Sequence, residues 1–292
     1  ATHLGRHDLG GGGNFNRNWP DLAPAAAEKV AGKLTESEDA NVVTIRAALL
    51  EAVAEMTPRT QLDSLRQVLA GQAVDADLVF DLHCDDDALM HFFVIPQHWP
   101  LAADIAAELG CRAVMLSEDS GGGSFDEACS LPWVKLAGRY PDHPIPAACL
   151  AGTVEFRGQR DVSDRFAERD GAALFRGLQR HGVIDGDPGP LAAALCEATP
   201  LAGCEFVKAP APGVVSYAVA LGERVEKDQV IAWLIDPAAE DPNAGRRAIR
   251  AGTAGRILSR RDRLYVQPGE TLAKVVGREP LAAPRAKNLL GD

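Results

Sequence analysis

The sequence predicts a layered α/β domain followed by a smaller all-β domain. Strand-like and helix-like segments alternate over residues 1–200, whereas short β-rich segments separated by turns fill residues 201–278. Alternation of strands with helices is typical of α/β layers, and many short strands with turn signals indicate an all-β domain.

Four segments have the features of helices. Residues 41–56 and 60–70 carry apolar residues at helical spacing. Residues 100–109 are rich in alanine and are followed by Gly110, a residue that commonly ends a helix. Residues 162–181 form an amphipathic pattern that stops before a glycine. We expect these segments to cover the sheet.

Three apolar segments between the helices are predicted to be buried strands. They are residues 78–83 (LVFDLH), residues 112–116 and a segment that ends at residues 153–156 (TVEF). His83 and Glu155 therefore stand at strand ends. In open α/β sheets ligands gather at the carboxyl ends of strands, which makes both residues candidates for a site.

The second half of the chain has a different composition. Residues 183–200 are rich in Gly, Pro and Ala and are predicted to be a linker. Beyond them, residues 208–215 resemble residues 250–257, and residues 221–223 resemble residues 268–270, so the small domain has an internal repeat. We predict domains at residues 1–200 and 201–278, with a tail at 279–292.

Composition excludes several classes of protein. The formal net charge is -11, which disfavours nucleic acid as a partner. No apolar run reaches the roughly 18 residues that a membrane-spanning helix needs. The six cysteines are scattered without a C-x-x-C pair, which indicates a reducing cytoplasm. The sequence is compatible with a homo-oligomer.

Taken singly, the candidate site residues have ordinary interpretations as well. His83 is a candidate zinc ligand or a histidine satisfied by hydrogen bonds, and we favour the second by about two to one. Glu155 is a candidate general base or an ordinary strand-end carboxylate. Asn16 and Arg17, in a glycine-rich loop, would suit a substrate carboxylate or merely cap the loop.

Other charged and flexible segments are also ambiguous. Arg157 is predicted to share a face with Glu155, where it would bind substrate or form a structural ion pair. The acidic run at residues 85–87 suits a substrate with a positive group, although a solvated loop is the simpler expectation. The glycines at 121–123 suit a lid or a plain loop. The arginines at 256, 260, 261 and 263 are interpreted as a solvated face.

Three fragments in order resemble the succinylglutamate desuccinylase/aspartoacylase branch of the zinc carboxypeptidase superfamily. Residues 14–20 (NFNRNWP) resemble its D-L-N-R-x-F-P motif, residues 81–83 (DLH) its D-L-H motif, and residues 153–155 (TVE) its T-V-E motif. The resemblance covers nearly the whole chain. It implies a carboxypeptidase-like mixed sheet flanked by helices, with a small barrel-like domain after it.

The resemblance also implies roles for residues. His83 would be the third zinc ligand, and Glu155 the general base that activates a metal-bound water. Asn16 and Arg17 would hold the carboxylate of an N-acyl amino acid, and Arg6 would polarise the scissile carbonyl or bind the substrate. One Zn²⁺ per chain is implied, with Asp81 fixing the tautomer of its histidine ligand.

The family's first two zinc ligands come from an H-x-x-E motif, which this sequence lacks. We therefore expect those two ligands upstream of Ala1. The resulting hypothesis is a zinc-dependent deacylase that hydrolyses the amide bond of a small N-acyl amino acid. The alternative is a catalytically inactive small-molecule binding protein on the same scaffold. A weaker alternative, a carrier module, is disfavoured because the β domain lacks a Met-Lys signature.

Overall fold

The computed structural model describes residues 2–3, 6–8, 10, 13–241 and 243–281. Most of the predicted tail therefore lies outside the described residues. A mixed sheet runs through the first part of the chain, in the strand order β4-β8-β6-β7-β9. Its strands are β4 (Leu78–Asp85), β6 (His91–Val94), β7 (Ala113–Leu116), β8 (Leu150–Gly158) and β9 (Ala198–Pro200).

The sheet is mixed because its strands do not all run the same way. Strand β8 is parallel to β4 and antiparallel to β6, while β7 is parallel to both β6 and β9. The prediction of an α/β layer is confirmed. The predicted linker over 183–200 is wrong at its end, because β9 pairs with β7. A three-residue edge strand is too short to show a period of two in the sequence.

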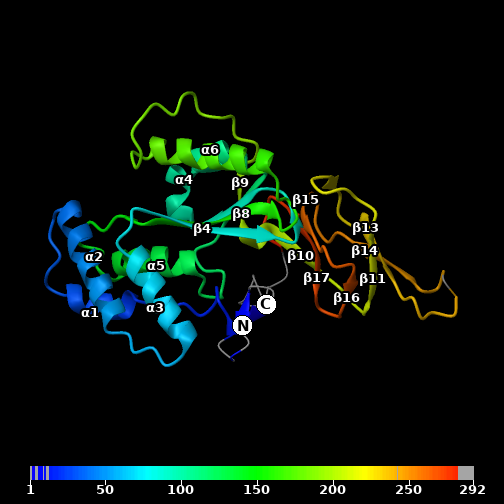
Figure 1. Cartoon of the computed structure of the whole chain (residues 1–292), viewed down its shortest axis with the longest axis horizontal. Coiled ribbons are helices and arrows are strands. Elements are labelled where there is room, and N and C mark those ends of the chain that lie inside the picture. The colour runs from blue at the N-terminus through cyan, green and yellow to red at the C-terminus, as the bar shows by residue number, and fades with distance from the viewer. Residues whose placement is uncertain (1, 4–5, 9, 11–12, 242, 282–292) are drawn as a thin grey trace.

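Helices cover both faces of this sheet (Figure 1). One face carries α1, α2, α3 and α5, and the other carries α4 and α6. The helices are α1 (Ala23–Val30), α2 (Glu38–Ala54), α3 (Gln61–Ala73), α4 (Trp99–Leu109), α5 (Phe125–Arg139) and α6 (Asp164–Arg180). The four predicted helices are confirmed as α2, α3, α4 and α6, within a few residues at each end.

Two helices lacked a clear sequence signal. Helix α5 contains Pro132, which interrupts a helical pattern. A capping box starts it, since the Ser124 side chain accepts from the backbone of Glu127 and the Glu127 side chain accepts from the backbone of Ser124. Helix α1 has only eight residues. Helix α1 packs on α2 and α5, and α5 packs on β4 and β8, so tertiary contacts stabilise both helices.

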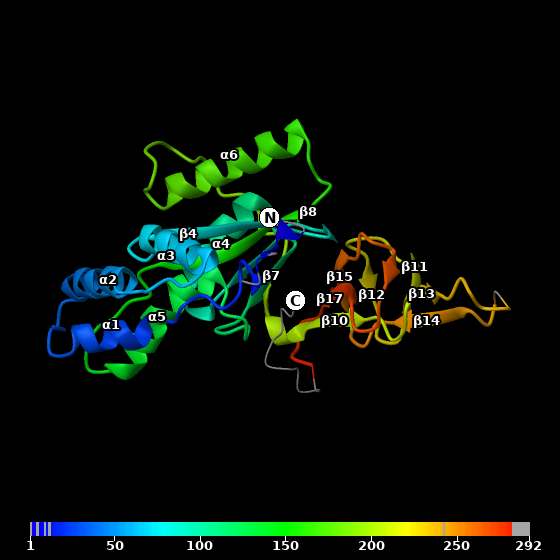
Figure 2. The ribbon, with the colours of Figure 1, turned by 60° about the horizontal axis from the view of Figure 1, so that its bottom comes forward.

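The region from residue 204 to 276 forms two antiparallel sheets, which lie to one side of the helical layers (Figure 2). The all-β prediction is confirmed there, whereas closure into a barrel and the domain boundaries stay predictions. The first sheet has β10 (Cys204–Lys208), β12 (Arg224–Val225), β15 (Gly255–Arg260) and β17 (Thr271–Val276). The second has β11 (Gly213–Tyr217), β13 (Val230–Ile235), β14 (Arg246–Arg250) and β16 (Tyr265–Val266).

The internal repeat appears in the turns of this region. Gly222 and Gly269 both have positive φ angles, of 82° and 85°. Each is followed by a glutamate whose carboxylate accepts from a backbone amide three residues earlier, Glu223 from Ala220 at 2.8 Å and Glu270 from Gln267 at 2.6 Å. Glycine is needed at both positions because other residues rarely adopt this backbone conformation.

The β region docks on the central sheet through an apolar patch and a strand pairing. Phe93 and Met115 of the central sheet pack against Leu201, Cys204 and Leu258. Beside this patch, β5 (Asp87–Ala88) pairs with β15. The chain that leaves β4 therefore becomes an edge strand of the β region.

The acidic run at residues 85–87 forms ion pairs with the β region. Asp85 pairs with Lys274 at 2.6 Å, Asp87 with Arg260 at 2.6 Å, and Asp86 lies 3.7 Å from Arg261. Both expectations of solvation, for the acidic loop and for the arginines at 260 and 261, are therefore wrong. Charges of opposite sign from distant segments meet at this interface, which no local pattern in the sequence indicates.

We predict that Lys274→Met lowers the free energy of unfolding by about 3–5 kcal/mol. The substitution leaves Asp85 buried without its cation, and breaking a buried pair from one side costs about this much. Chemical denaturation monitored by circular dichroism measures the change. Lys227→Met, at an exposed lysine, is the matched control and should stay within about 0.5 kcal/mol of the parent. Equal midpoints for the two variants would contradict the prediction.

Candidate active site

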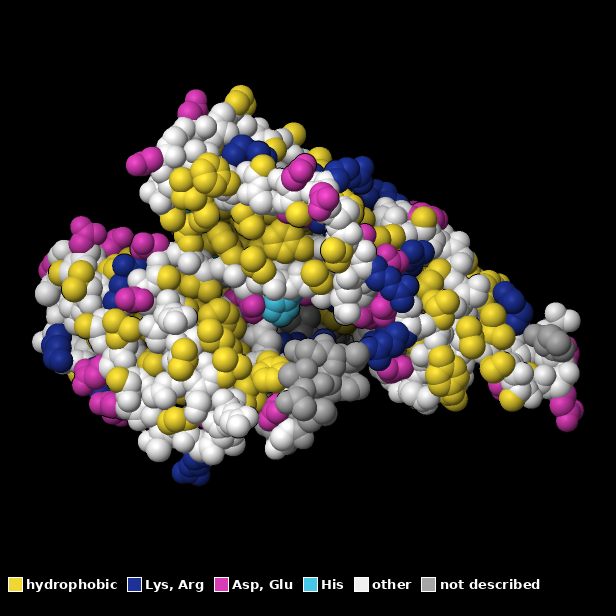
Figure 3. All heavy atoms as spheres, viewed as in Figure 1, with side chains coloured by type: hydrophobic (Ala, Val, Ile, Leu, Met, Phe, Trp, Pro, Cys, Tyr) yellow, Lys and Arg dark blue, Asp and Glu magenta, His cyan; other side chains and the backbone are white. Residues whose placement is uncertain are grey.

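His83 and Glu155 lie side by side near the carboxyl ends of two parallel strands. The register of β4 and β8 pairs them directly, and His83 Nδ1 is 3.8 Å from Glu155 Oε1. Lateral neighbours in a sheet share a face, so both side chains point the same way. Figure 3 shows histidine and acidic side chains at a hollow in the middle of one face of the molecule.

The other ring nitrogen of His83 is held by the Asp81 carboxylate, which Asn16 supports. Nε2 is 2.9 Å from Asp81 Oδ2 and 3.0 Å from Asn16 Nδ2. Asn16 Nδ2 donates to the same Asp81 oxygen at 2.7 Å. Burial lowers the pKa of His83, but the hydrogen bond and charge of Asp81, with the charge of Glu155, raise it above the usual value overall. The imidazole is thereby fixed in orientation.

The loop that carries Asn16 is anchored to the start of α5. Asn16 Oδ1 accepts from the backbone amide of Phe125 at 2.8 Å. The amides of Asn18 and Trp19 donate to the carbonyls of Gly122 and Gly123, each at 2.9 Å. The glycines at 121–123 thus form part of the wall that holds this loop.

Arg66 is a buried residue that sequence analysis did not single out. It extends from α3 and donates to the carbonyls of Arg17 at 2.5 Å and Asn14 at 3.3 Å. The guanidinium of Arg17 donates to the carbonyl of Asn16 at 2.6 Å. In the sequence Arg66 has the position of a surface residue on a helix. The packing of α3 on the loop shows that it holds the loop's backbone instead.

Glu155 is buried and has one oxygen without a partner. Its side chain is 12% exposed, and Oε2 makes no hydrogen bond to any residue that the structure describes. Burial and the charge of Asp85 raise the pKa of Glu155 to about 7, against the opposite effects of Lys274 and His83. A carboxylate with this pKa suits proton transfer near neutral pH.

Asp126 is a second buried carboxylate near His83 and Glu155. The sequence did not indicate it. It lies in the first turn of α5, where Ser124 Oγ donates to it. Burial, with the charges of Glu127 and Asp81, raises its pKa to about 6. Its charge also raises the pKa of His83, which places Asp126 within electrostatic reach of the imidazole.

The remaining candidates are not gathered around His83. Arg157 forms an ion pair with Asp170 of α6 and stacks on the Phe166 ring at 4.2 Å, so the structural alternative holds for this guanidinium. Its φ angle is 65°, and the register shifts after His83, so the expected alternation of side chains fails here. Substrate binding by Arg157 stays a prediction.

Arg6 lies in a turn between β1 (Thr2–His3) and β2 (His7–Asp8) and is exposed. Its carbonyl accepts from the amide of Phe15 at 2.9 Å, where β3 (Gly13–Asn14) has just ended. No hydrogen bond joins its guanidinium to another residue within the described ranges. Its predicted role on the substrate carbonyl stays a prediction.

The described residues fit part of a metal site. The donor set offers one imidazole with a nitrogen facing Glu155 and the other held by Asp81, an arrangement seen around metal-bound histidine. Within the described part of the chain, no three His, Cys, Asp or Glu side chains gather in a group that could hold a metal. Two more ligands would therefore have to come from elsewhere.

The comparisons with solved structures identify the fold. Two proteins of the succinylglutamate desuccinylase/aspartoacylase family, from Shewanella frigidimarina NCIMB 400 and Shewanella amazonensis SB2B, superpose with TM-scores of 0.81 and 0.79. Each is 23% identical to this chain, and each alignment covers 94% of it and 74% or 75% of the neighbour. No protein-family model and no curated protein matches the sequence.

A third neighbour is more distant and carries a ligand. The product-bound ectoine utilization protein EutE (DoeB) from Ruegeria pomeroyi has a TM-score of 0.59 and 18% identity, over 90% of this chain and 83% of its own. The chain therefore has the fold of the succinylglutamate desuccinylase/aspartoacylase proteins. In the described residues no helix is long and apolar enough to cross a membrane, and all six cysteines are free thiols.

His91 generates a prediction about stability at acid pH. It is fully buried, its Nδ1 lies 2.7 Å from the Leu89 carbonyl oxygen, and burial and Lys274 lower its pKa to about 4. Below about pH 6.5 this histidine binds a proton in the unfolded chain but stays neutral in the folded chain. The free energy of unfolding therefore falls as the pH drops from 6.5 towards 4.

At pH 5 this histidine should cost about 2 kcal/mol relative to neutral pH. His91→Gln should remove that part of the pH dependence, and His143→Gln, at a more exposed histidine, should retain it. Urea denaturation at pH 7 and pH 5 measures the difference. A His91→Gln variant that loses as much stability as the parent between these pH values would contradict the prediction.

Proposed function

We propose that this protein belongs to the succinylglutamate desuccinylase/aspartoacylase family and is a zinc-dependent deacylase of small N-acyl amino acids. The observation that carries the proposal is the pairing of His83 with Glu155 across parallel strands. One carboxylate oxygen of Glu155 is buried and has no hydrogen-bond partner among the described residues. The fold of the neighbours and the order of the three motifs support it.

In the proposed reaction Glu155 is the general base. It takes a proton from the attacking water and passes it to the nitrogen of the leaving amine, so the amide bond breaks and a carboxylate and an amine form. Burial favours this role because it keeps the carboxylate basic near neutral pH. Oε2 has no hydrogen-bond partner among the described residues, so it is the oxygen to which we assign the proton.

His83 would hold the zinc ion with two ligands from outside the described residues. When bound, zinc lowers the pKa of water and polarises a carbonyl. Asp81 fixes the imidazole through Nε2, and Asn16 Nδ2 donates to the same Asp81 oxygen, which leaves Nδ1 on the side of Glu155. Asn16 therefore has a positioning role in addition to the substrate contact that the motif implies.

Arg17 and Arg6 would supply positive charge to the substrate. A planar guanidinium matches a carboxylate in a bidentate geometry, so the α-carboxylate of an N-acyl amino acid is the group that we assign to Arg17. Arg6 would stabilise the developing negative charge on the carbonyl oxygen. Since the aspartates at 85–87 form ion pairs with the β region, they give no support for a cationic substrate.

Glu155→Gln should lower kcat on an N-acyl amino acid by about 100-fold or more, with a small change in KM, because it removes proton transfer and keeps the shape of the side chain. A panel of N-succinyl and N-acetyl amino acids, followed by release of the free amine, provides the assay. Glu168→Gln, at an exposed glutamate of α6, is the control and should leave kcat unchanged. A Glu155→Gln variant with full activity would remove Glu155 as the base.

Zinc content separates the deacylase from its alternative. Elemental mass spectrometry on the full natural protein should find about one zinc per chain, and His83→Ala should lower this content at least tenfold, because removing a ligand weakens the site. His143→Ala, away from the site, is the control. Absence of zinc from the full protein would favour the inactive binding protein on the same scaffold.

A further inference from the structure

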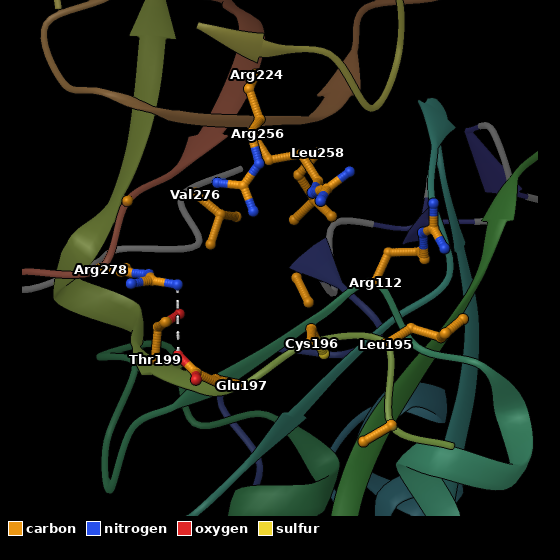
Figure 4. Close-up of a pocket in the computed structure, with 13 residues that line it drawn as sticks. Arg112, Leu195, Cys196, Glu197, Thr199, Arg224, Arg256, Leu258, Val276 and Arg278 are labelled. Carbon is orange, nitrogen blue, oxygen red and sulfur yellow. Dashed lines mark ion pairs between the residues drawn. The ribbon is translucent and has the colours of Figure 1, made fainter. Parts of the chain in front are cut away.

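A cavity lies between the central sheet and the β region, apart from the candidate active site. It has a volume of about 430 Å³ and is lined by Arg112 and Thr199 from one side and by Arg224, Arg256 and Arg278 from the other (Figure 4). None of the residues around His83 lines it.

The position of the cavity follows from the strand register. Ala113, in its wall, lies opposite His91, and His91 lies opposite Glu155. At about 4.8 Å per strand, the cavity begins about 10 Å from Glu155 along the sheet. The apolar patch that contains Ala113 and Leu258 forms part of its wall. The cavity is therefore close to the candidate active site but is a separate compartment.

Positive charge in this cavity is not balanced by the residues that line it. Four arginines face one carboxylate, Glu197, in a chain whose formal net charge is -11. The only ion pair among the lining residues joins Arg278 to Glu197 at 3.6 Å. The two side chains are 77% and 81% exposed, so the pair is weak. A ligand with several negative charges would replace Glu197 as the partner of Arg278 with little loss of free energy.

The arginines are close enough to affect one another. Burial lowers the pKa of Arg256, and the charges of Arg224 and Arg112 lower it further. Arg256 donates to the Gly222 carbonyl at 3.0 Å, which fixes its guanidinium at the wall. Repulsion among like charges held in place is relieved when an anion binds between them.

The wall of the cavity also contains a threonine with a buried hydroxyl. Thr199 lines the cavity, but its Oγ1 is shielded from solvent and has no hydrogen-bond partner among the described residues. Buried polar groups nearly always have a partner. The arginines, and not this hydroxyl, are therefore the groups that an anion in the cavity would contact.

We propose that this cavity binds a small multivalent oxyanion, a phosphoryl or polycarboxylate group, that bridges the central sheet and the β region. Its arginines come from both sides of the interface, so a bound anion would stabilise the docking of the two parts. Because the test follows binding and not catalysis, the proposal stands or falls independently of the deacylase activity.

The test is thermal denaturation of the protein with pyrophosphate, citrate or inorganic phosphate, each against sodium chloride at matched ionic strength. We expect a saturable rise in the midpoint with pyrophosphate, citrate or both. A response to pyrophosphate alone would identify a phosphoryl ligand, and a response to citrate alone a polycarboxylate. No rise beyond that with sodium chloride would overturn the proposal.

Variants locate the site. Arg224→Gln/Arg256→Gln should weaken binding about tenfold or more, because charge-assisted contacts to the anion are lost. Arg112→Gln/Arg224→Gln, at two exposed arginines, keeps the test decisive if the first variant does not fold. Arg247→Gln, an exposed arginine of β14 outside the cavity, should bind as the parent does. Equal binding by all variants would also overturn the proposal.

Discussion

The alignment of β4 with β8 is the constraint on which the candidate site depends. Parallel pairing sets His83 beside Glu155, and Asp81, two residues earlier on the same face, reaches the same imidazole. One residue of slippage would turn these side chains to the opposite face. Just beyond the pair the register shifts, and Gly158 passes so close to Asp86 that an added Cβ would lie 2.6 Å from its carbonyl oxygen. This irregularity sends Arg157 towards α6 instead of Glu155.

Two neighbouring carboxylates near the candidate site, Asp85 and Glu155, have pKa values shifted in opposite directions. Lys274 and His91 keep the pKa of Asp85 at about 2, in spite of its burial. Among the described residues no cation lies equally close to Glu155, so burial raises its pKa to about 7. Two carboxylates near each other thus differ because one has a direct ion pair and the other does not. Such separation is what acid and base chemistry in one site requires.

The β region affects the charge around the candidate site. It supplies the Lys274 that neutralises Asp85, and it covers the apolar patch next to the row of polar residues. Its arginines neutralise the rest of the acidic run. The same interface forms the arginine-lined cavity, so the anion-binding proposal rests on how the β region docks on the central sheet.

The sequence by itself determined the α/β and all-β character of the two parts, the main helices and the strand ends that carry His83 and Glu155. These features rest on local periodicity and on short motifs, which a chain displays without folding. Only the tertiary structure decided the partners of Arg157, of Arg66 and of the acidic run at 85–87. It also decided the place of β9 and the existence of the cavity. The physical reason is that ion pairs and edge strands join residues far apart in the chain, and no local pattern records which distant charge or strand will be the neighbour.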